Sequence, residues 1–427
     1  MQIKTLNIES YRHLENINFD FTYPTGHINA GKPLEKICLI GQSATGKTSI
    51  LELIKDTFLK LETTEVLNGT HLFHHFQLNF NGEIEYLHKN EPLLIKENKI
   101  VQNGNEYSNI EAGGGSVGQL INEGLRLLYF SSDIISKETI EFFNQNPINL
   151  NNSTDESHQG RIRNINQPNY IYEFKQEINK EIWFSLLSKI LDYRKRFTQM
   201  ASELINKGAI GDLNKLNKQY EKWAADNENP LIRFANYFDP ISKKLNLEID
   251  LVNTEYPIPI RSKITNDDVV PISSLSTGTK SLLLSMFPLF ELDTTDSIIL
   301  IDEPERSLFP DMQIDLVNHY KNIAPASQLI IATHSPFIAA AFEPEERFIL
   351  SFDKEGKVAI HRGISPIGDD PNDILMNDFK VDYYNEFGKK AYQEYLHLKR
   401  KVAEEPEIEK KKELVVELAE LGDKYNF

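Results

Sequence analysis

The stretch that decides the fold is Gly41–Thr48, which reads GQSATGKT. It follows a short apolar run, Glu35–Ile40, and leads into a segment with helical periodicity from Lys47 to about Leu61. The pattern G-x-x-x-x-G-K followed by Ser or Thr, between a strand and a helix, is typical of a loop whose backbone amides surround a phosphate. The sequence therefore predicts an α/β fold with a phosphate-binding loop at the end of a strand.

The residue types in this loop indicate which ligand it holds. Lys47 is expected to reach the β- and γ-phosphates of a nucleotide, and the hydroxyl of Thr48 is expected to ligate Mg²⁺. Loop amides and the start of the helix should hold the remaining phosphate oxygens. We therefore predict ATP and Mg²⁺ as cofactors, and the nucleotide-binding residues Gly41, Gln42, Ser43, Ala44, Thr45, Gly46, Lys47, Thr48 and Ser49.

A second apolar run, Ser297–Ile301, ends in the two carboxylates Asp302 and Glu303. A buried strand that ends in acids is expected where a metal ion lies at the carboxyl edge of a sheet. Asp302 is then the Mg²⁺-site carboxylate, and Glu303 is the base that orients and deprotonates the attacking water. Taken alone, the run also fits a strand followed by an acidic turn, but its combination with loop 41–48 favours the metal site.

A third strand-like run ends in Thr333-His334-Ser335-Pro336. A histidine at a sheet edge can hydrogen-bond a γ-phosphate or the attacking water, although a lone histidine is more often structural. Because His334 follows two other strand-end motifs, we interpret it as functional. The predicted catalytic residues are therefore Glu303, His334 and Lys47.

A further turn of small residues, Ser274–Ser281, begins an apolar helix shortly before Asp302 in the chain. Small residues and a glycine at a helix start form an anion site. Since loop 41–48 already serves the chain's own nucleotide, a second such turn indicates action in trans, across a dimer. An ordinary serine N-cap is the alternative. The residues predicted to reach the nucleotide of a partner copy are Ser276, Gly278 and Lys280.

These four motifs, in this order, resemble those of ABC-type ATPases, and more closely the SMC/RecF/OLD-like branch. The resemblance implies an ATP-hydrolysing P-loop head, with a Walker A at 41–48, the signature at 275–280, a Walker B at 298–303 and a switch histidine at His334. The run Ser10-Tyr11-Arg12 resembles the branch's N-F-R element, which implies that Arg12 approaches the nucleotide. The implied architecture is a mixed sheet with flanking helices, an antiparallel β-subdomain and a short helical insert.

The sequence departs from this branch at several positions. Ser43-Ala44 replaces the usual Asn-Gly of the Walker A, Thr277 replaces a signature glycine, and Phe309 stands where a histidine is usual. The Q-loop glutamine is not evident, because Ser131-Ser132-Asp133 follows the strand where it is expected. None of these changes removes a catalytic charge, so ATP hydrolysis remains the expectation.

The pattern along the chain divides it into four parts. Alternation in residues 1–40 and 72–101 predicts strands, and long helices are expected over 170–223, broken near Gly208–Gly211. We expect an N-terminal ATPase lobe at 1–135, a mainly helical insert at 136–235, a C-terminal ATPase lobe at 236–365 and a helical C-terminal extension at 366–427.

A histidine group depends on one predicted turn. If Asn81-Gly82 forms a two-residue hairpin turn, His75 lies opposite His88, with His71 and His74 nearby. Such a group can bind a metal, but its spacing matches no standard zinc pattern. Surface histidines on a hairpin are the simpler interpretation.

Composition limits the partners. The net charge of −17 and the pI of about 5.2 disfavour general attachment to nucleic acid or anionic lipid. Arg161–Arg163 and Arg194–Arg196 are either local basic patches or solvated helix faces. The single cysteine, Cys38, lies in an apolar run and fits a reducing compartment, and no apolar run approaches the roughly 18 residues of a membrane span. A cytoplasmic protein without membrane contact is predicted.

The resemblance also implies a role. Its ATP-sandwiched heads imply a homodimer, or a higher even oligomer, that nucleotide switches between states. With its short helical insert, compact head and C-terminal helical extension, the chain looks similar to the ATPases of Septu, retron or PARIS antiphage systems, which implies a separate effector protein, a nuclease or a toxin. About 90 residues follow His334, fewer than the head and a nuclease domain need together. A RecF-like DNA-repair ATPase and a transporter ATP-binding subunit remain as alternatives.

Overall fold

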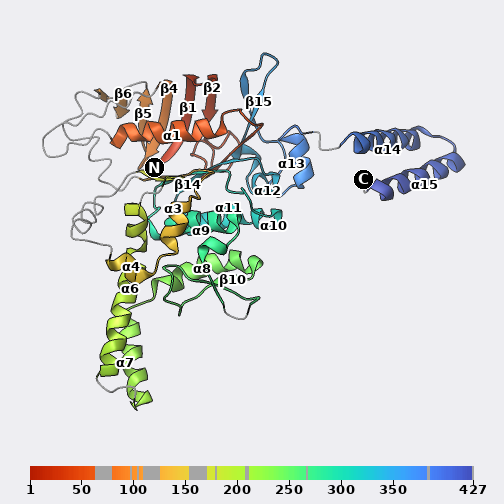
Figure 1. Cartoon of the computed structure of the whole chain (residues 1–427). Coiled ribbons are helices and arrows are strands. Elements are labelled where there is room, and N and C mark those ends of the chain that lie inside the picture. The colour runs from red at the N-terminus through yellow and green to blue at the C-terminus, as the bar shows by residue number, and fades with distance from the viewer. Residues whose placement is uncertain are drawn as a thin grey trace.

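A seven-stranded, mostly parallel sheet forms the centre of the molecule (Figure 1). The structure is a computed structural model and describes residues 1–62, 79–96, 99–102, 105–108, 126–152, 171–177, 180–206, 211–265, 268–381 and 385–425. All neighbours pair in parallel except β15 and β16. The strand order is β16 (Val358–Arg362), β15 (Arg347–Phe352), β3 (Lys36–Gly41), β14 (Gln328–Thr333), β13 (Ile298–Asp302), β8 (Leu127–Phe130) and β9 (Ile171–Phe174).

The interiors of the central strands β3, β14 and β13 are apolar because both of their faces are covered. Along β3, Cys38 and Ile40 belong to one apolar core and Ile37 and Leu39 to the other. This alternation follows from the two-residue repeat of a strand, which points successive side chains to opposite faces. The predicted α/β fold, with a mixed sheet and flanking helices, is confirmed. Cys38 is fully buried, as its apolar surroundings indicated.

One face of the central sheet carries helix α1 (Lys47–Glu62), which lies between it and a second, antiparallel sheet (Figure 1). Apolar side chains of α1, such as Ile50, Leu51 and Ile54, fill the core between the two sheets. This is the predicted antiparallel β-subdomain. Its strand order is β2 (Leu14–Asp20), β1 (Gln2–Tyr11), β4 (Asn81–His88), β5 (Glu91–Lys96), β6 (Lys99–Gln102) and β7 (Asn105–Ser108).

The other face is covered by helices, of which α9 (Thr277–Glu291) and α11 (Leu316–Ile323) belong to the core next to the sheet. Long helices α6 (Lys180–Asn206) and α7 (Leu213–Asp226) form a hairpin that extends away from the head (Figure 1). The predicted helix break therefore falls between them. The remaining helices on this side are α3 (Lys137–Phe143), α4 (Pro147–Asn152), α8 (Pro230–Ser242), α10 (Pro310–Gln313) and α12 (Pro336–Ala339).

Smaller elements complete the chain. A three-stranded sheet of β10 (Leu247–Ile249), β11 (Ile260–Ser262) and β12 (Val269–Val270) lies beside α8, and 3-10 turns occupy Lys243–Leu245, Ile272–Ser274 and Pro344–Glu346. After α13 (Pro371–Asn377), the helices α14 (Glu386–Glu404) and α15 (Ile408–Tyr425) form a hairpin that projects from the head (Figure 1). Within the described residues, no helix is long and apolar enough to cross a membrane.

The predicted hairpin turn at Asn81-Gly82 is wrong. These two residues begin β4, and a Cβ on Gly82 would lie 2.1 Å from the carbonyl oxygen of Asn7, so the glycine serves close strand pairing rather than a turn. The hairpin turn lies at Lys89 and Asn90, whose φ angles are 48° and 68°.

The proposed histidine group loses its basis with that turn. His71, His74 and His75 lie outside the described residues, as do Arg161–Arg163. His88 is buried in β4. The described part of the chain contains no cluster of three His, Cys, Asp or Glu side chains that could hold a metal ion.

Candidate nucleotide-binding site

Three of the predicted motifs meet at the carboxyl edge of the central sheet. β14 lies between β3 and β13 and is parallel to both, with Thr333 opposite Ile40 and Ala332 opposite Asp302. Parallel strands end at the same edge, so loop 41–48, the residues after Asp302 and His334 lie side by side there. Segments almost 300 residues apart in the chain are thereby brought into one site.

Loop 41–48 needs an unusual backbone. Ala44 and Gly46 have φ angles of 65° and 92°. Ala44 stands where the related branch usually carries glycine, and an alanine in this left-handed region costs about 1–2 kcal/mol. A Cβ at Gly41 would lie 2.3 Å from the carbonyl oxygen of Leu350, so a glycine is required where the loop leaves β3. Ala44 therefore adopts the left-handed backbone conformation that a glycine would take without steric cost.

Lys47 is the first residue of α1 and is almost fully buried. Its Nζ donates to the carbonyl oxygens of Gly41 at 2.9 Å and Gln42 at 3.1 Å. Burial lowers the pKa of Lys47, and the nearby carboxylates of Glu303 and Asp302 oppose that shift. The ammonium group therefore lies inside the loop, where it can meet phosphate oxygens.

Thr48 and Asp302 form the donor set predicted for a metal ion. The Thr48 hydroxyl donates to Oδ2 of Asp302 at 2.9 Å, and Oδ1 of Asp302 is buried without a hydrogen-bond partner. Burial raises the pKa of Asp302 from 3.8 to about 6, against the effect of the Thr48 hydrogen bond. A hydroxyl and an incompletely bonded carboxylate are hard oxygen ligands, so these residues fit Mg²⁺ with water and phosphate completing its shell.

The raised pKa of Asp302 predicts how the metal-free protein responds to pH. Because the folded-state pKa lies above the unfolded value, the charged carboxylate destabilises the fold at pH values above about 6, and this effect declines as the pH falls toward 3.8. Asp302→Asn, in the presence of a chelator, should raise the free energy of unfolding by up to about 3 kcal/mol at pH 8 and by about half of that at pH 5. Denaturant unfolding at both pH values measures this.

The matched control for that experiment is Asp226→Asn, at an exposed aspartate that ends α7. It should leave the pH dependence unchanged. An Asp302→Asn protein whose gain in stability is equal at pH 8 and pH 5 would contradict the burial of a charge at this position.

Glu303 and His334 face each other at the sheet edge. The Glu303 amide donates to the carbonyl oxygen of Ala332 at 2.8 Å, with its own φ at 47°. Its Oε1 lies 3.6 Å from Nε2 of His334, and both side chains remain partly exposed. Burial and the charge of Lys47 lower the pKa of His334, so the imidazole is neutral near pH 7. A carboxylate and a neutral imidazole therefore share access to the space beside Lys47.

Glu305 is a residue of this site that sequence reasoning missed. Its Oε1 accepts hydrogen bonds from the Thr333 hydroxyl at 2.7 Å and from the His334 amide at 2.8 Å. Burial raises the pKa of Glu305, although these two bonds oppose the shift. In the sequence, Glu305 is visible only as an acid three positions after Asp302. Its partner Thr333 lies 28 residues further along the chain, so no local pattern links the two.

The predicted trans-acting turn packs against its own chain. The Ser276 hydroxyl caps α9 by accepting from the Thr279 amide at 3.2 Å, and Ser276 itself is exposed. A Cβ at Gly278 would lie 2.3 Å from the carbonyl oxygen of Ser307, so the glycine permits close contact with the segment after Glu303. In the described residues, no hydrogen bond links Ser276, Gly278 or Lys280 to loop 41–48.

Arg12 lies beside the nucleotide loop. Its Nη1 donates to the Ser49 hydroxyl at 3.1 Å and to Glu52 at 2.5 Å, both on the first turns of α1. The turn that carries Arg12 also brings His13 against Gly46, since a Cβ there would lie 3.1 Å from Nε2 of His13. Arg12 is about half exposed. It lies next to loop 41–48, in line with the approach to the nucleotide that the resemblance implied.

The segment where the Q-loop is expected has no glutamine and contacts the residues after Glu303 through its backbone. Ser131-Ser132-Asp133 follows β8, the neighbour of β13. The Arg306 guanidinium donates to the Ser132 carbonyl oxygen at 3.1 Å. A main-chain carbonyl therefore makes the contact between this segment and the residues after Glu303.

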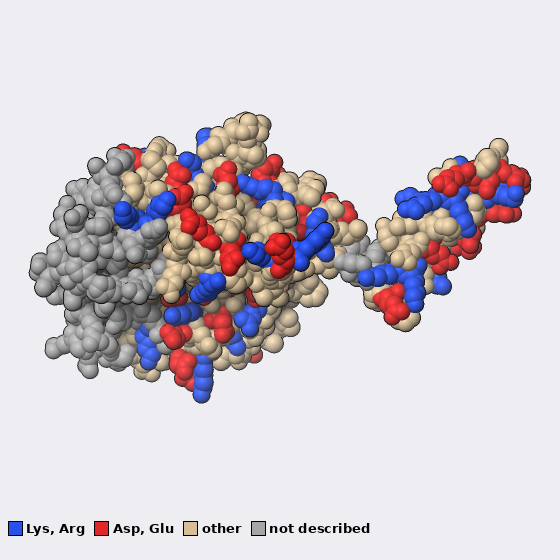
Figure 2. All heavy atoms as spheres, turned by 90° about the horizontal axis from the view of Figure 1, so that it is seen from above, with Lys and Arg blue, Asp and Glu red and all other residues tan. Residues whose placement is uncertain are grey.

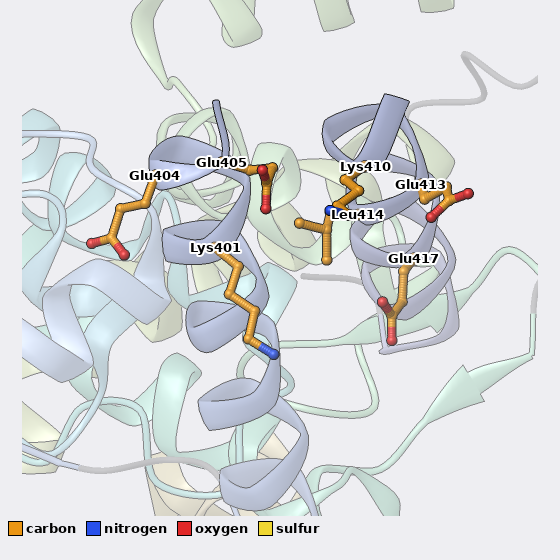
Figure 3. A pocket seen from close by; sticks show the side chains of 7 residues that line it. All are labelled: Lys401, Glu404, Glu405, Lys410, Glu413, Leu414 and Glu417. Carbon is orange, nitrogen blue, oxygen red and sulfur yellow. The ribbon is translucent and has the colours of Figure 1, made fainter. Parts of the chain in front are cut away.

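A groove of about 550 Å³ lies elsewhere, between α14 and α15 (Figure 3). Its lining is acidic overall, and four carboxylates would repel a nucleotide's phosphates. We therefore place the candidate site at the sheet edge. The residues that line the groove are Lys401, Glu404, Glu405, Lys410, Glu413, Leu414 and Glu417.

Comparison with known proteins gives one family match. A family model described as AAA ATPase domain matches residues 1–339. No curated protein matches the chain.

Solved structures of SMC heads are similar at low identity. The Smc head domain of Pyrococcus furiosus bound to the C-terminal domain of ScpA has 14% identity and a TM-score of 0.40, over 84% of this chain and 96% of that chain. An SmcHead bound to the C-winged helix domain of ScpA has 13% identity and a TM-score of 0.40, over 85% and 97%. The SMC head domain from Thermotoga maritima has 12% identity and a TM-score of 0.39, over 86% and 100%.

Proposed function

This chain belongs to the AAA ATPase domain family, and from that premise we propose that it hydrolyses ATP as a nucleotide-dependent dimerisation switch. The observation that carries the proposal is the hydrogen bond of 2.9 Å between Thr48 and Asp302, beside a buried and unbonded carboxylate oxygen. It joins the phosphate-binding loop after β3 to the acidic end of β13, two strands away in the sheet. This is where a P-loop ATPase holds its metal.

Each residue then has a role in hydrolysis. The loop amides and Lys47 bind the phosphate chain, and Thr48 with Asp302 would hold Mg²⁺, which neutralises charge on the β- and γ-oxygens. Glu303 orients a water molecule and takes its proton during attack on the γ-phosphorus. His334, neutral and 3.6 Å from Glu303, donates a hydrogen bond to the γ-phosphate.

Pairing of two copies completes the site. Ser276 is exposed at the start of α9, and the amides there form an anion site that the chain's own loop does not use. In a symmetric dimer, each Ser276–Lys280 turn meets the γ-phosphate bound by the partner subunit. ATP then favours the closed dimer because it contacts both copies only in that state. Hydrolysis releases them.

Trans action predicts complementation between two inactive variants. Lys47→Ala removes the phosphate contact of a chain, and Ser276→Arg blocks the turn it offers to its partner. Each variant alone should lose about 100-fold in ATP turnover. An equal mixture should recover up to about a quarter of the wild-type rate, because half of the dimers are mixed and each has one intact site of two. Steady-state phosphate release measures the rate.

The control for this experiment mixes Lys47→Ala with Glu303→Gln. Both residues belong to the phosphate-loop side of a site, so each site of a mixed dimer lacks one of them and no recovery is expected. Recovery in this control mixture, or its absence in the mixture of Lys47→Ala with Ser276→Arg, would contradict action in trans.

We propose that the switch serves a prokaryotic antiviral defence complex and controls a partner effector, a nuclease or a toxin. The resemblance to antiphage ATPases, in the short helical insert and the helical C-terminal extension, supports this role. Cells that carry the gene and its neighbours should resist phage infection, and Lys47→Ala should abolish that resistance. Protection that persists in the Lys47→Ala strain would exclude this function.

DNA binding is not part of the proposal. Acidic and basic side chains are interleaved on the described face in Figure 2, without a large basic area. The guanidinium of Arg194 donates hydrogen bonds to the carbonyl oxygens of Asn253 and Pro257. The guanidinium of Arg196 donates a hydrogen bond to Oδ1 of Asn227. Two of the three cations of Arg194–Arg196, the candidate basic patch, are therefore hydrogen-bonded within the chain.

A further inference from the structure

Glu305 is at the centre of a hydrogen-bonded ring that the proposed reaction does not use. Its carboxylate accepts from Thr333 at 2.7 Å, and the same Thr333 hydroxyl accepts from the Ser335 amide at 2.9 Å. The Ser335 hydroxyl donates to Gln313 at 2.6 Å. Gln313 donates to the Leu308 carbonyl oxygen at 2.7 Å. The Leu308 amide donates to the Glu305 carbonyl oxygen at 2.9 Å, which closes the ring.

This ring joins two segments that carry different parts of the site. One is the His334 loop after β14, and the other is the 304–309 segment after Glu303. Ser335 and Gln313 are buried, so their bonds are not replaced by water when they break. The ring therefore fixes the two segments relative to each other.

A direct bond connects the ring to the histidine. The amide of His334 donates to Glu305 at 2.8 Å, so the carboxylate sets the backbone from which the imidazole projects toward Glu303. The Ser307 carbonyl oxygen, one residue before Leu308 of the ring, packs against Gly278 of the predicted trans-acting turn. Glu305 thus bonds the His334 amide directly and lies two residues before Ser307, which contacts the Ser276–Lys280 turn.

We propose that Glu305 is a positioning residue for ATP hydrolysis, holding His334 at the distance from Glu303 that the reaction needs. This inference rests on the proposed function. Glu305 contacts neither nucleotide nor water in this role and acts only through His334. Misplacing a catalytic group by about 1 Å costs on the order of 100-fold in rate.

The test is a set of Glu305 variants in the full-length protein. Glu305→Ala removes the acceptor for both bonds and should lower kcat about 10- to 100-fold, while the KM for ATP changes less than about threefold. Glu305→Gln keeps an amide oxygen that accepts the same two bonds. It should stay within about threefold of the wild-type kcat.

A double variant separates positioning from general destabilisation. If Glu305 acts through His334, the Glu305→Ala/His334→Ala protein should be no slower than His334→Ala alone. Additive losses would overturn the inference. The matched control is Glu346→Ala, at another buried glutamate that accepts a backbone amide, that of Glu343 at 2.9 Å. It should lower Tm and leave kcat unchanged.

A second readout works without turnover. The His334 ring signal in a ¹³C-labelled histidine NMR spectrum, assigned by its loss in His334→Ala, should shift in Glu305→Ala and stay in place in Glu305→Gln. A wild-type protein without ATPase activity would contradict the proposed function alone, and the NMR result would still decide this inference. Normal turnover or an unshifted His334 signal in Glu305→Ala would overturn it.

Discussion

Glu303→Gln will lower ATP turnover by about 10²- to 10⁴-fold and leave a dimer that persists with ATP bound. Glutamine matches glutamate in shape but cannot take a proton from water. Lys47, Thr48 and Asp302 are unchanged, so phosphate and metal binding should survive. Phosphate release measures turnover, and size-exclusion chromatography with light scattering measures the dimer.

The control for that experiment is Glu355→Gln, in the exposed turn between β15 and β16. It should behave as the wild type in both measurements. Removal of Mg²⁺ by a chelator should dissolve the Glu303→Gln dimer if the metal is part of the bound nucleotide complex. Wild-type turnover in Glu303→Gln would show that Glu303 is not the base. A monomer in the presence of ATP would refute the switch.

The parts of this site that sequence predicts are those encoded by local patterns. Loop 41–48 and the two carboxylates at the end of β13 each directly follow an apolar run, and the carboxyl ends of buried parallel strands are where α/β proteins bind their ligands. The order of the strands does not follow from such patterns. β14 inserts between β3 and β13 through long-range pairing, and only that order brings His334 within 3.6 Å of Glu303.

Glu305 and Gly82 show why the rest was not predicted. Glu305 gains its importance from two donors 28 and 29 residues further along the chain, which no local pattern encodes. At Gly82, the dipeptide Asn-Gly has the composition of a turn, but tertiary pairing with β1 requires a glycine for a different reason. Composition alone cannot separate a glycine that turns the chain from one that admits a neighbouring backbone.

We expect the largest effect on stability at a buried ion pair. No sequence pattern indicated this pair. Arg347 on β15 and Asp378 after α13 are both fully buried, with Nε and Oδ2 3.1 Å apart. Asp378 also accepts from the amides of Ile364 at 2.9 Å and Ser365 at 3.3 Å. A Cβ at Gly363 would lie 2.7 Å from Nε of Arg347, so the chain passes very close to the guanidinium.

Asp378→Ala should therefore lower the free energy of unfolding by about 3–5 kcal/mol, because it leaves a buried cation without its counter-charge and two amides without their acceptor. Arg347→Met/Asp378→Asn removes both charges and keeps an oxygen for the amides, so it should recover most of the loss. Lys390→Ala breaks an exposed ion pair with Glu386 and should cost less than about 0.5 kcal/mol. Urea unfolding measures all three. A double variant as unstable as Asp378→Ala would mean that packing, and not the uncompensated charge, causes the loss.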